Sequence, residues 1–320
     1  MQTALLFQRD AVEEVDDWSE CFPRLGRSSV LWIDFERPDG DEIDRLEELL
    51  ELRPESVSAL TDDHASPTPT FSDFGDYLHV NVRAPTDDDE LRRVDCLVSE
   101  RWVVTVHDRP VDVVDTYRER ASGSGDTGKL DGLEFLANLL EWVLESYFDA
   151  FERIELELEK VDTSAMSGTV SSKDEVIARL VEVRGQIGKL RRALASHREP
   201  ILSLTRPELE AITSSSSAER FAALRDRLEA AVQAARDSRE SVVGSFDVLL
   251  ASTGQRTNEI MKVLTLVSVL ILPGTLLAGV MGMNFKLGVF TEAVYFWVVI
   301  AAMVLIAIVT LVVARMRDWV

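Results

Sequence analysis

Cysteine and histidine are scarce in this 320-residue chain, and neither forms a reactive pattern. Cys21 and Cys96 stand alone, without CxxC spacing or a paired histidine. We expect both to be small buried residues of a protein in a reducing compartment. No histidine lies in a recognisable motif with a catalytic nucleophile, so the sequence gives no reason to expect an enzyme.

Basic residues are also in short supply, and they do not cluster. Residues 1–260 hold 54 acidic side chains against 30 basic ones, and only six of the 34 basic residues in the whole chain are lysines. Without a basic patch there is nothing to neutralise phosphates, so we expect no nucleic-acid partner. The acidity favours a halophilic surface, on which high salt screens self-repulsion. Sensing of divalent cations by carboxylates is the alternative.

The last 60 residues almost lack acidic charge and contain two long apolar runs. Residues 263–281 and 294–314 hold no charged side chain over 19 and 21 positions, close to the roughly 20 residues that a helix needs to cross a bilayer. No signal peptide precedes the acidic part. Basic residues flank the inner end of each run and predict cytoplasmic termini: Arg256, Lys262, Arg315 and Arg317. We therefore expect a multi-pass protein of the plasma membrane, with the lipid bilayer as a partner.

Hydrophobic periodicity divides the chain into three regions. Residues 1–125 alternate strand-like and helix-like segments, which predicts a small cytoplasmic α/β domain. Residues 126–260 predict a helical hairpin and a long stalk helix, and residues 261–320 a two-helix transmembrane domain. The expected strands cover 29–35, 77–83, 96–99 and 102–107, and the expected helices cover 42–50, 130–161, 173–197 and 218–281.

The last of these helices is expected to run without a break from the cytoplasmic part into the membrane. From residue 218 onward no proline occurs before Pro273, and the only glycines before it are Gly244 and Gly254. At 1.5 Å per residue such a helix is about 95 Å long. A heptad-like seam on it predicts packing in a bundle or between subunits: Phe221, Leu224, Leu228, Ala231, Ala235, Val242 and Leu249.

Two short motifs have a plainer explanation than the one they first suggest. Residues 123–130, GSGDTGKL, resemble a phosphate-binding loop, but Leu130 stands where a magnesium-binding Ser or Thr is required. We interpret the segment as a linker and expect no organic cofactor. Asp62, Asp63 and His64 have no further ligand at helical or strand spacing, which favours a solvated turn before Pro67.

The first apolar run carries small and polar residues on one helical face. Asn258, Thr265, Ser268, Thr275 and Gly279 follow one another in steps of 7, 3, 7 and 4 residues. Met261, Leu264 and Leu272 lie on or beside the same stripe. Such a stripe suits either helix packing through small residues or a water-filled pore with a dewetting constriction. One helix cannot enclose a pore, so the second interpretation requires several subunits around an axis.

At the outer end of the stripe stands the tripeptide Gly282, Met283 and Asn284. Around an axis it would form a ring of asparagine amides and glycine carbonyls. Magnesium sheds its water reluctantly, and neutral oxygens can hydrogen-bond the hydrating waters without trapping the ion. The motif therefore predicts a selectivity filter.

These residues together resemble the CorA family of divalent-cation channels. The resemblance rests on the run from Thr257 to Thr265, on Pro273, Thr275, Ala278 and Gly279, on Gly282 to Phe285, and on the basic-aromatic end from Arg315 to Trp319. It implies a homopentamer with a funnel-shaped cytoplasmic domain and a pore lined by the first membrane helix. Divalent cations would be the partners, chiefly magnesium but also cobalt or nickel, driven inward by the membrane potential.

The resemblance also assigns roles to individual positions. Gly282, Met283 and Asn284 match the filter. Asn258, Thr275 and Gly279 match polar pore positions, and Met261, Leu264 and Leu272 match the hydrophobic constriction. A regulatory magnesium is implied between neighbouring subunits, but Ser58, Ala59 and Ala223 stand where its carboxylates are expected, with Asp226 one turn away. Met281 replaces a usual tyrosine, and Lys286 stands in an outer loop that is commonly acidic.

Two other functions stay open on sequence grounds. One is a zinc transporter resembling ZntB. Neither apolar run contains an acidic residue, and this counts against such a transporter because proton coupling usually needs one. The other is a membrane-anchored sensor, in which the two helices only tether the acidic domain.

Overall fold

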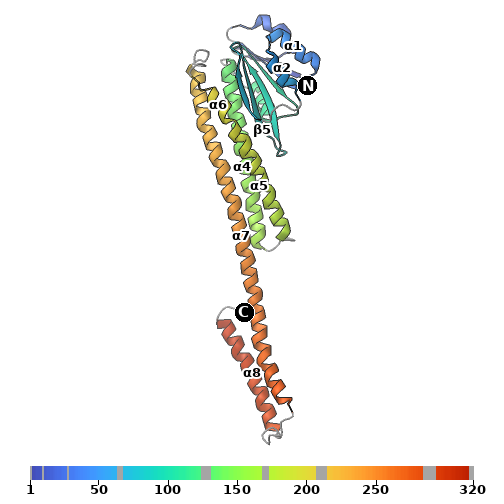
Figure 1. Ribbon diagram of the computed structural model, residues 1–320, viewed down its shortest axis with the longest axis vertical. Helices are drawn as coiled ribbons and strands as arrows, with labels where there is room; N and C mark the ends of the chain where they lie inside the picture. The colour runs from blue at the N-terminus through green and yellow to red at the C-terminus, as the bar shows by residue number, and fades with distance from the viewer. Residues whose placement is uncertain are drawn as a thin grey trace. The chain divides into compact units, whose positions relative to one another are not determined.

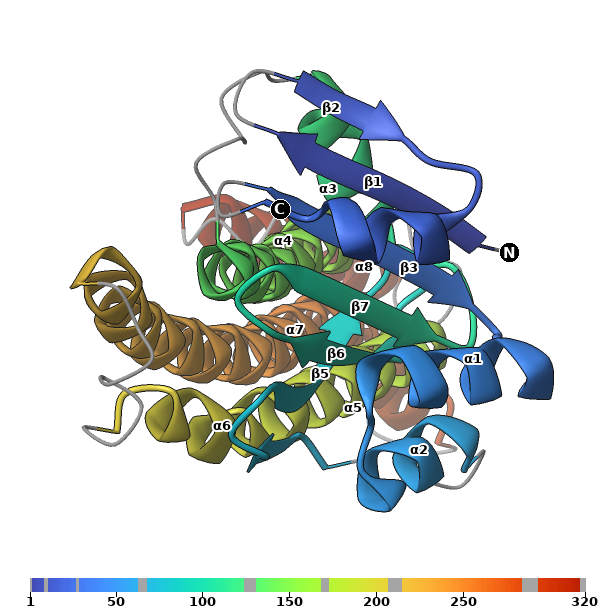
Figure 2. The ribbon, with the colours of Figure 1, turned by 90° about the horizontal axis from the view of Figure 1, so that it is seen from above.

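A seven-stranded mixed sheet organises the N-terminal part of the chain (Figure 2). The computed structural model describes residues 2–8, 11–26, 29–62, 68–123, 131–167, 173–206, 215–283 and 293–316. The strand order is β2-β1-β3-β7-β6-β5-β4, and the β3–β7 pair at the centre is parallel whereas the other neighbours are antiparallel. The strands are β1 (Gln2–Gln8), β2 (Ala11–Glu14), β3 (Val30–Glu36), β4 (Thr70–Asp73), β5 (Leu78–Pro85), β6 (Leu91–Val98) and β7 (Trp102–His107).

Helices cover both faces of this sheet, so its central strands are apolar on both sides. On one face lie η1 (Trp18–Arg24), α1 (Gly40–Leu50) and α2 (Pro54–Thr61), and Trp18 and Leu46 join Ile33 and Phe35 in one core. On the other face lie α3 (Asp112–Gly123) and α4 (Gly132–Ser167). There Phe135 stacks on Trp32 at 5.0 Å between ring centroids. The four strands expected from the sequence are confirmed as β3, β5, β6 and β7, and the expected helix 42–50 is confirmed as α1, with ends shifted by a few residues.

Polar groups inside the sheet are paired with one another. Asp34 of β3 accepts a hydrogen bond from Thr105 at 2.5 Å and lies 3.3 Å from His107. On β5, His79 contacts Asp95 at 3.0 Å. Buried polar side chains of this kind need partners, and these have them.

The helices within residues 132–245 pack side by side (Figure 1). They are α4, α5 (Lys173–Ser196), the short α6 (Arg198–Ser203) and the first part of α7 (Ser215–Met281). All seven residues of the predicted seam on α7 are buried. Polar contacts between α4 and α7 join residues 82 or 83 positions apart, which shows two parallel helices in constant register: Asn138 with Arg220, Glu145 with Arg227, Glu155 with Ser238, and Asp162 with Ser245.

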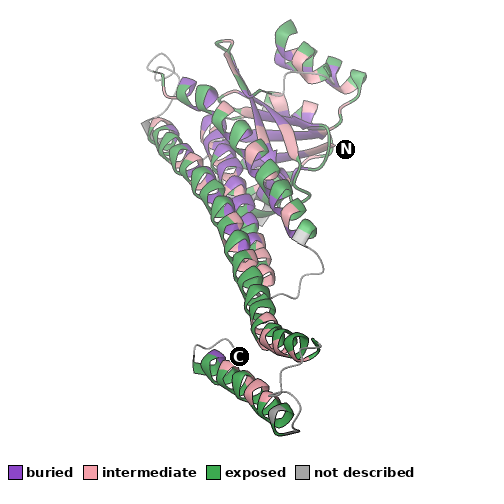
Figure 3. Cartoon of the chain, turned by 60° about the horizontal axis from the view of Figure 1, so that its bottom comes forward, coloured by how far each residue is buried: buried purple, intermediate pink, exposed green. Residues whose placement is uncertain are grey.

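The helix α7 continues without interruption through Pro273 to Met281, as its lack of earlier helix breakers predicts. The chain divides into two compact units, residues 1–245 and 246–320, and the boundary falls within this helix. The second unit consists of the rest of α7 and α8 (Ala293–Met316). Both α7 and α8 contain a segment long and apolar enough to span a membrane, and α8 is mostly exposed in the single chain (Figure 3).

Candidate functional site

In the second unit, α7 uses one face to pack against α8. This face holds half-buried residues spaced by three or four positions, as one helical face requires: Leu266, Leu270, Gly274, Leu277 and Met281. Pro273 and Ser268 are half-buried as well. The two helices lie close together at Gly274, where an added Cβ would lie 3.0 Å from the methyl group of Met303 on α8. The facing side of α8 is made largely of small residues: Val299, Ala302, Met303, Ala307, Thr310 and Ala314.

The predicted stripe lies on the opposite face of α7. Ser268 precedes Leu270 by two residues, which is about 200° of rotation around the helix. Four residues of the stripe are exposed and one, Ser268, is half-buried; the exposed ones are Asn258, Thr265, Thr275 and Gly279. A Cβ added to Gly279 would meet nothing within 4 Å among the described residues. The packing of α7 on α8 therefore does not account for the stripe. That packing uses Gly274 instead, which sequence reasoning did not single out.

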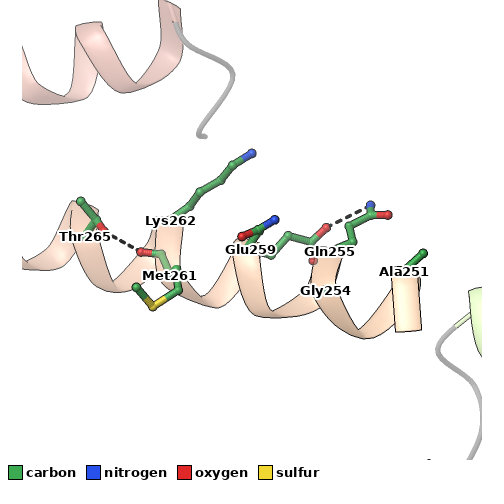
Figure 4. A pocket seen from close by; sticks show the side chains of 8 residues that line it. Ala251, Gly254, Gln255, Glu259, Met261, Lys262 and Thr265 are labelled. Carbon is green, nitrogen blue, oxygen red and sulfur yellow. Dashed lines mark hydrogen bonds between the residues drawn. The ribbon is translucent and has the colours of Figure 1, made fainter. Parts of the chain in front are cut away.

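Thr265 lies at the edge of the stripe nearest to α8. It lines an apolar groove with Val309 and Val313 of α8, and it also borders a shallow hollow along α7 from Ala251 to Thr265 (Figure 4). This residue therefore faces both the stripe and the α7–α8 groove.

The three hydroxyl groups of the stripe share one hydrogen-bonding arrangement. Thr265, Ser268 and Thr275 each donate to the backbone carbonyl four residues earlier, at 2.7, 2.9 and 2.9 Å. With its proton committed to the helix, each hydroxyl oxygen can only accept from a group outside it. A hydrated cation presents the protons of its waters outward, so acceptors are the groups that can hydrogen-bond its shell.

Large apolar side chains separate these acceptors along the helix. Met261, Leu264 and Leu272 are 55%, 58% and 66% exposed. In Figure 4, Met261 and Lys262 extend to different sides of α7. Met261 precedes Thr265 of the stripe by four residues and so lies on the same helical face. The arrangement alternates acceptor groups with apolar ones along one open helical face.

The helix ends at the predicted filter. The amide of Gly282 still donates to the carbonyl of Ala278 at 2.9 Å, whereas that of Met283 donates to Val280 at 3.2 Å, so the last turn tightens. A Cβ at position 282 would lie 3.3 Å from the oxygen of Ala278, which favours glycine there. Asn284 lies outside the described residues.

The candidates for metal binding in residues 1–245 are not brought together in the chain. Asp226 is an exposed residue of α7 whose carboxylate contacts Arg225 at 3.2 Å. Within the described ranges, no group of three or more His, Cys, Asp and Glu side chains is placed to hold a metal ion. Ala59 of α2 and Ala223 of α7 offer no ligand side chain.

The two cysteines lie inside the fold. Cys21 and Cys96 are both buried, as predicted, and burial raises the pKa of the Cys96 thiol. His197 is also buried, and its desolvation lowers its pKa to about 4. Residues 124–130, most of the motif that resembles a phosphate-binding loop, lie outside the described residues, as do Asp63 and His64.

Comparison with known proteins identifies the family. The family described as "CorA-like Mg2+ transporter protein" matches residues 27–315. The chain belongs to this family. CorA-like proteins are transporters of the membrane and not enzymes, which confirms the expectations drawn from the two apolar helices and from the missing catalytic motifs.

Individual CorA relatives match over nearly the whole chain. The cobalt/magnesium transport protein CorA of Thermotoga maritima is 25% identical over 313 residues, which cover 95% of this chain and 87% of that protein. The solved CorA magnesium transporter of Methanocaldococcus jannaschii superposes with a TM-score of 0.75 at 20% identity and covers 100% of this chain and 99% of its own. The expected fold class is thereby confirmed: an α/β domain, a long helix and two C-terminal apolar helices.

A more distant likeness is to the solved cytoplasmic domain of another protein. The ZntB cytoplasmic domain of Vibrio parahaemolyticus gives a TM-score of 0.60 at 12% identity, over 79% of this chain and 98% of that domain. At this identity the likeness shows a shared fold.

Proposed function

We propose that this chain is the subunit of a homopentameric channel that lets magnesium into the cytoplasm, and also cobalt or nickel. One observation carries the proposal. The stripe of α7 is turned away from α8, and its hydroxyls are fixed as hydrogen-bond acceptors. Five copies of this face around an axis would enclose a path lined by groups that suit a hydrated cation.

In this pore each predicted residue has a physical role. Gly282, Met283 and Asn284 form the outer filter, where amide and carbonyl oxygens bind the waters around the ion rather than the ion itself. The lining is formed by Asn258, Thr265, Ser268, Thr275 and Gly279. Met261, Leu264 and Leu272 form the hydrophobic gate, which closes by excluding water.

The membrane potential supplies the driving force. Moving one charge through 100 mV yields about 2.3 kcal/mol, so a divalent ion gains about 4.6 kcal/mol without ATP. We place both termini in the cytoplasm, with residues 1–125 and 126–260 forming the cytoplasmic domain and stalk and residues 261–320 the membrane part. The basic residues Lys262 and Arg315 then lie at the inner surface.

Asp226 is the candidate ligand for a regulatory internal magnesium. It is the nearest acidic side chain to the expected regulatory position, and its partner Arg225 competes for it. A regulatory magnesium would need carboxylates from a neighbouring subunit to complete its ligands. Adaptation to high salt is the other explanation for the acidic surface.

The decisive experiment measures magnesium influx into proteoliposomes that contain a magnesium-sensitive dye, at an imposed negative-inside potential. We expect Asn284→Ala to lower uptake, or the preference for magnesium, roughly tenfold or more, because each subunit loses a hydrogen-bonding amide from the filter. Thr310→Val is the matched control, since Thr310 lies in α8 on the side of α7 and donates to Ile306 at 2.8 Å.

Each other outcome selects a different function. If wild-type protein passes no magnesium at any potential but moves zinc under a proton gradient, the protein is a zinc transporter of the ZntB kind. If wild type and Asn284→Ala take up magnesium equally, the filter assignment is wrong. If the wild type moves no divalent ion at all, the tethered-sensor interpretation replaces the channel.

A further inference from the structure

One hydroxyl group lies in the middle of the apolar segment assigned to the gate. Ser268 follows Leu264 by four residues and precedes Leu272 by four. Each such step rises about 6 Å and turns about 40° beyond a full turn. Ser268 is therefore midway between the two leucines both in height and in direction, at the centre of the gate and not at its edge.

Among the described residues, Ser268 is half-buried, and packing on α8 does not explain its position. The face of α7 that contacts α8 is centred near Leu270, about 200° away from Ser268. Leu264 and Leu272, above and below the serine, are 58% and 66% exposed. On the line that runs from Leu264 to Leu272, Ser268 is the hydroxyl residue, whereas Thr265 lies about 60° to one side of it and borders the α7–α8 groove.

The hydroxyl group is oriented to receive a water molecule. Ser268 Oγ donates its proton to the carbonyl oxygen of Leu264 at 2.9 Å, which fixes the side chain and leaves the oxygen free to accept. An apolar cavity stays dry, whereas a cavity with two to four polar partners holds ordered water. Five such oxygens around an axis provide those partners.

We propose that Ser268 forms a ring that holds water inside the hydrophobic gate and divides it into two apolar segments of about 6 Å each. This inference rests on the proposed pore. The water ring lowers the barrier to wetting the gate, so that a hydrated cation crosses two short dry segments instead of one long one. Ser268 thus sets how readily the gate conducts, while the filter sets which ion enters.

The first test compares Ser268→Ala with wild type in the proteoliposome assay. We expect magnesium uptake to fall about fivefold, equivalent to about 1 kcal/mol in the barrier. Ser268→Thr keeps the hydroxyl and should retain most of the uptake. Ser252→Ala is the matched control, because Ser252 lies on the same helix, donates to Leu249 at 3.0 Å, and is turned about 160° from Ser268.

A second measurement reads water access directly. Ser268→Cys should react with a water-soluble, positively charged thiol reagent in the reconstituted protein, and the reaction should block uptake. Val269→Cys, one residue further along the helix and turned about 100° away, should react at least tenfold more slowly. Gel filtration of every variant shows whether it still assembles.

The outcomes separate this inference from the proposed function. If Asn284→Ala impairs uptake but Ser268→Ala matches wild type, the pore stands and the water ring is refuted. An inert Ser268→Cys in a channel that conducts also refutes it. If Ser268→Ala and Ser252→Ala lower uptake equally, the effect is a general one on the helix and the inference fails. If neither Asn284 nor Ser268 affects uptake, the proposed pore itself is wrong.

Discussion

A buried histidine makes the first compact unit of the protein, residues 1–245, sensitive to acid. His197 follows α5 directly and is completely buried. Its Nε2 accepts a hydrogen bond from the backbone amide of Arg83 on β5 at 3.0 Å, and its Nδ1 donates to the carbonyl of Ala193 at 2.8 Å. Because Nε2 accepts, the ring is neutral in the folded protein, and a second proton would break the bond to β5.

The sign and size of the effect follow from the pKa. Burial lowers the pKa of His197 to about 4, whereas an unfolded chain binds the proton near pH 6.5. Between these values the unfolded state holds a proton that the folded state lacks, so the free energy of unfolding falls as the pH falls. The contribution is fully present above about pH 6.5, and about 2 kcal/mol of it is lost between pH 7 and pH 5.

The substitution His197→Gln tests this reasoning, because glutamine can accept from one partner and donate to the other without titrating. Chemical unfolding of the full-length protein in detergent, followed by tryptophan fluorescence at pH 7, 6 and 5, gives the free energy of unfolding for both proteins. We expect the wild type to lose about 2 kcal/mol more than the variant over this range. Groups common to both proteins cancel in this difference. Parallel pH profiles would refute the argument.

Two further predictions concern the sheet and its supporting helix. Gly132→Ala should lower the free energy of unfolding by roughly 3 kcal/mol or more, because the new Cβ would lie 1.9 Å from the backbone oxygen of Ser99. Gly185→Ala in α5 is the control, since its Cβ meets nothing within 4 Å and the change should be neutral or slightly stabilising. Chemical unfolding followed by tryptophan fluorescence measures both. Cys96 should resist N-ethylmaleimide at pH 8 and react only in denaturant, since burial raises the pKa of its thiol, and mass spectrometry before and after unfolding checks this.

The helical part of the fold follows closely from the sequence because its signals are local. The continuity of α7 depends on the absence of helix breakers between Ser215 and Pro273, and its buried seam on the repeat of apolar residues. Both properties can be counted along the chain. The direction of the stripe relative to α8 could not be obtained in this way, because it depends on which face α7 offers to its neighbour.

The sheet was predictable only in part. Its most regular strands have alternating or apolar patterns, whereas the sequence did not predict β1 or the two edge strands, β2 and β4. The parallel pairing of β3 with β7 joins Asp34 to Thr105, 71 residues away, and no periodicity signals a contact over that distance. The hydroxyl orientations on α7 also required coordinates, since a threonine in a helix can point its proton in more than one direction.

The stripe's own chemistry shows which of its residues argue most strongly for a pore. The hydroxyls of Thr265, Ser268 and Thr275 are satisfied by their own helix, so facing lipid would cost them little. Asn258 is different, because an amide has two donor hydrogens and an acceptor oxygen that a helix backbone cannot satisfy together. In the proposed pore it stands at the inner end of the stripe, and Asn284 stands at the outer end. Groups that need water therefore mark the two ends of the stripe, and groups that only tolerate water lie between them. A helix-packing surface has no reason for this order, whereas a path that takes up a hydrated ion at one end and releases it at the other requires it.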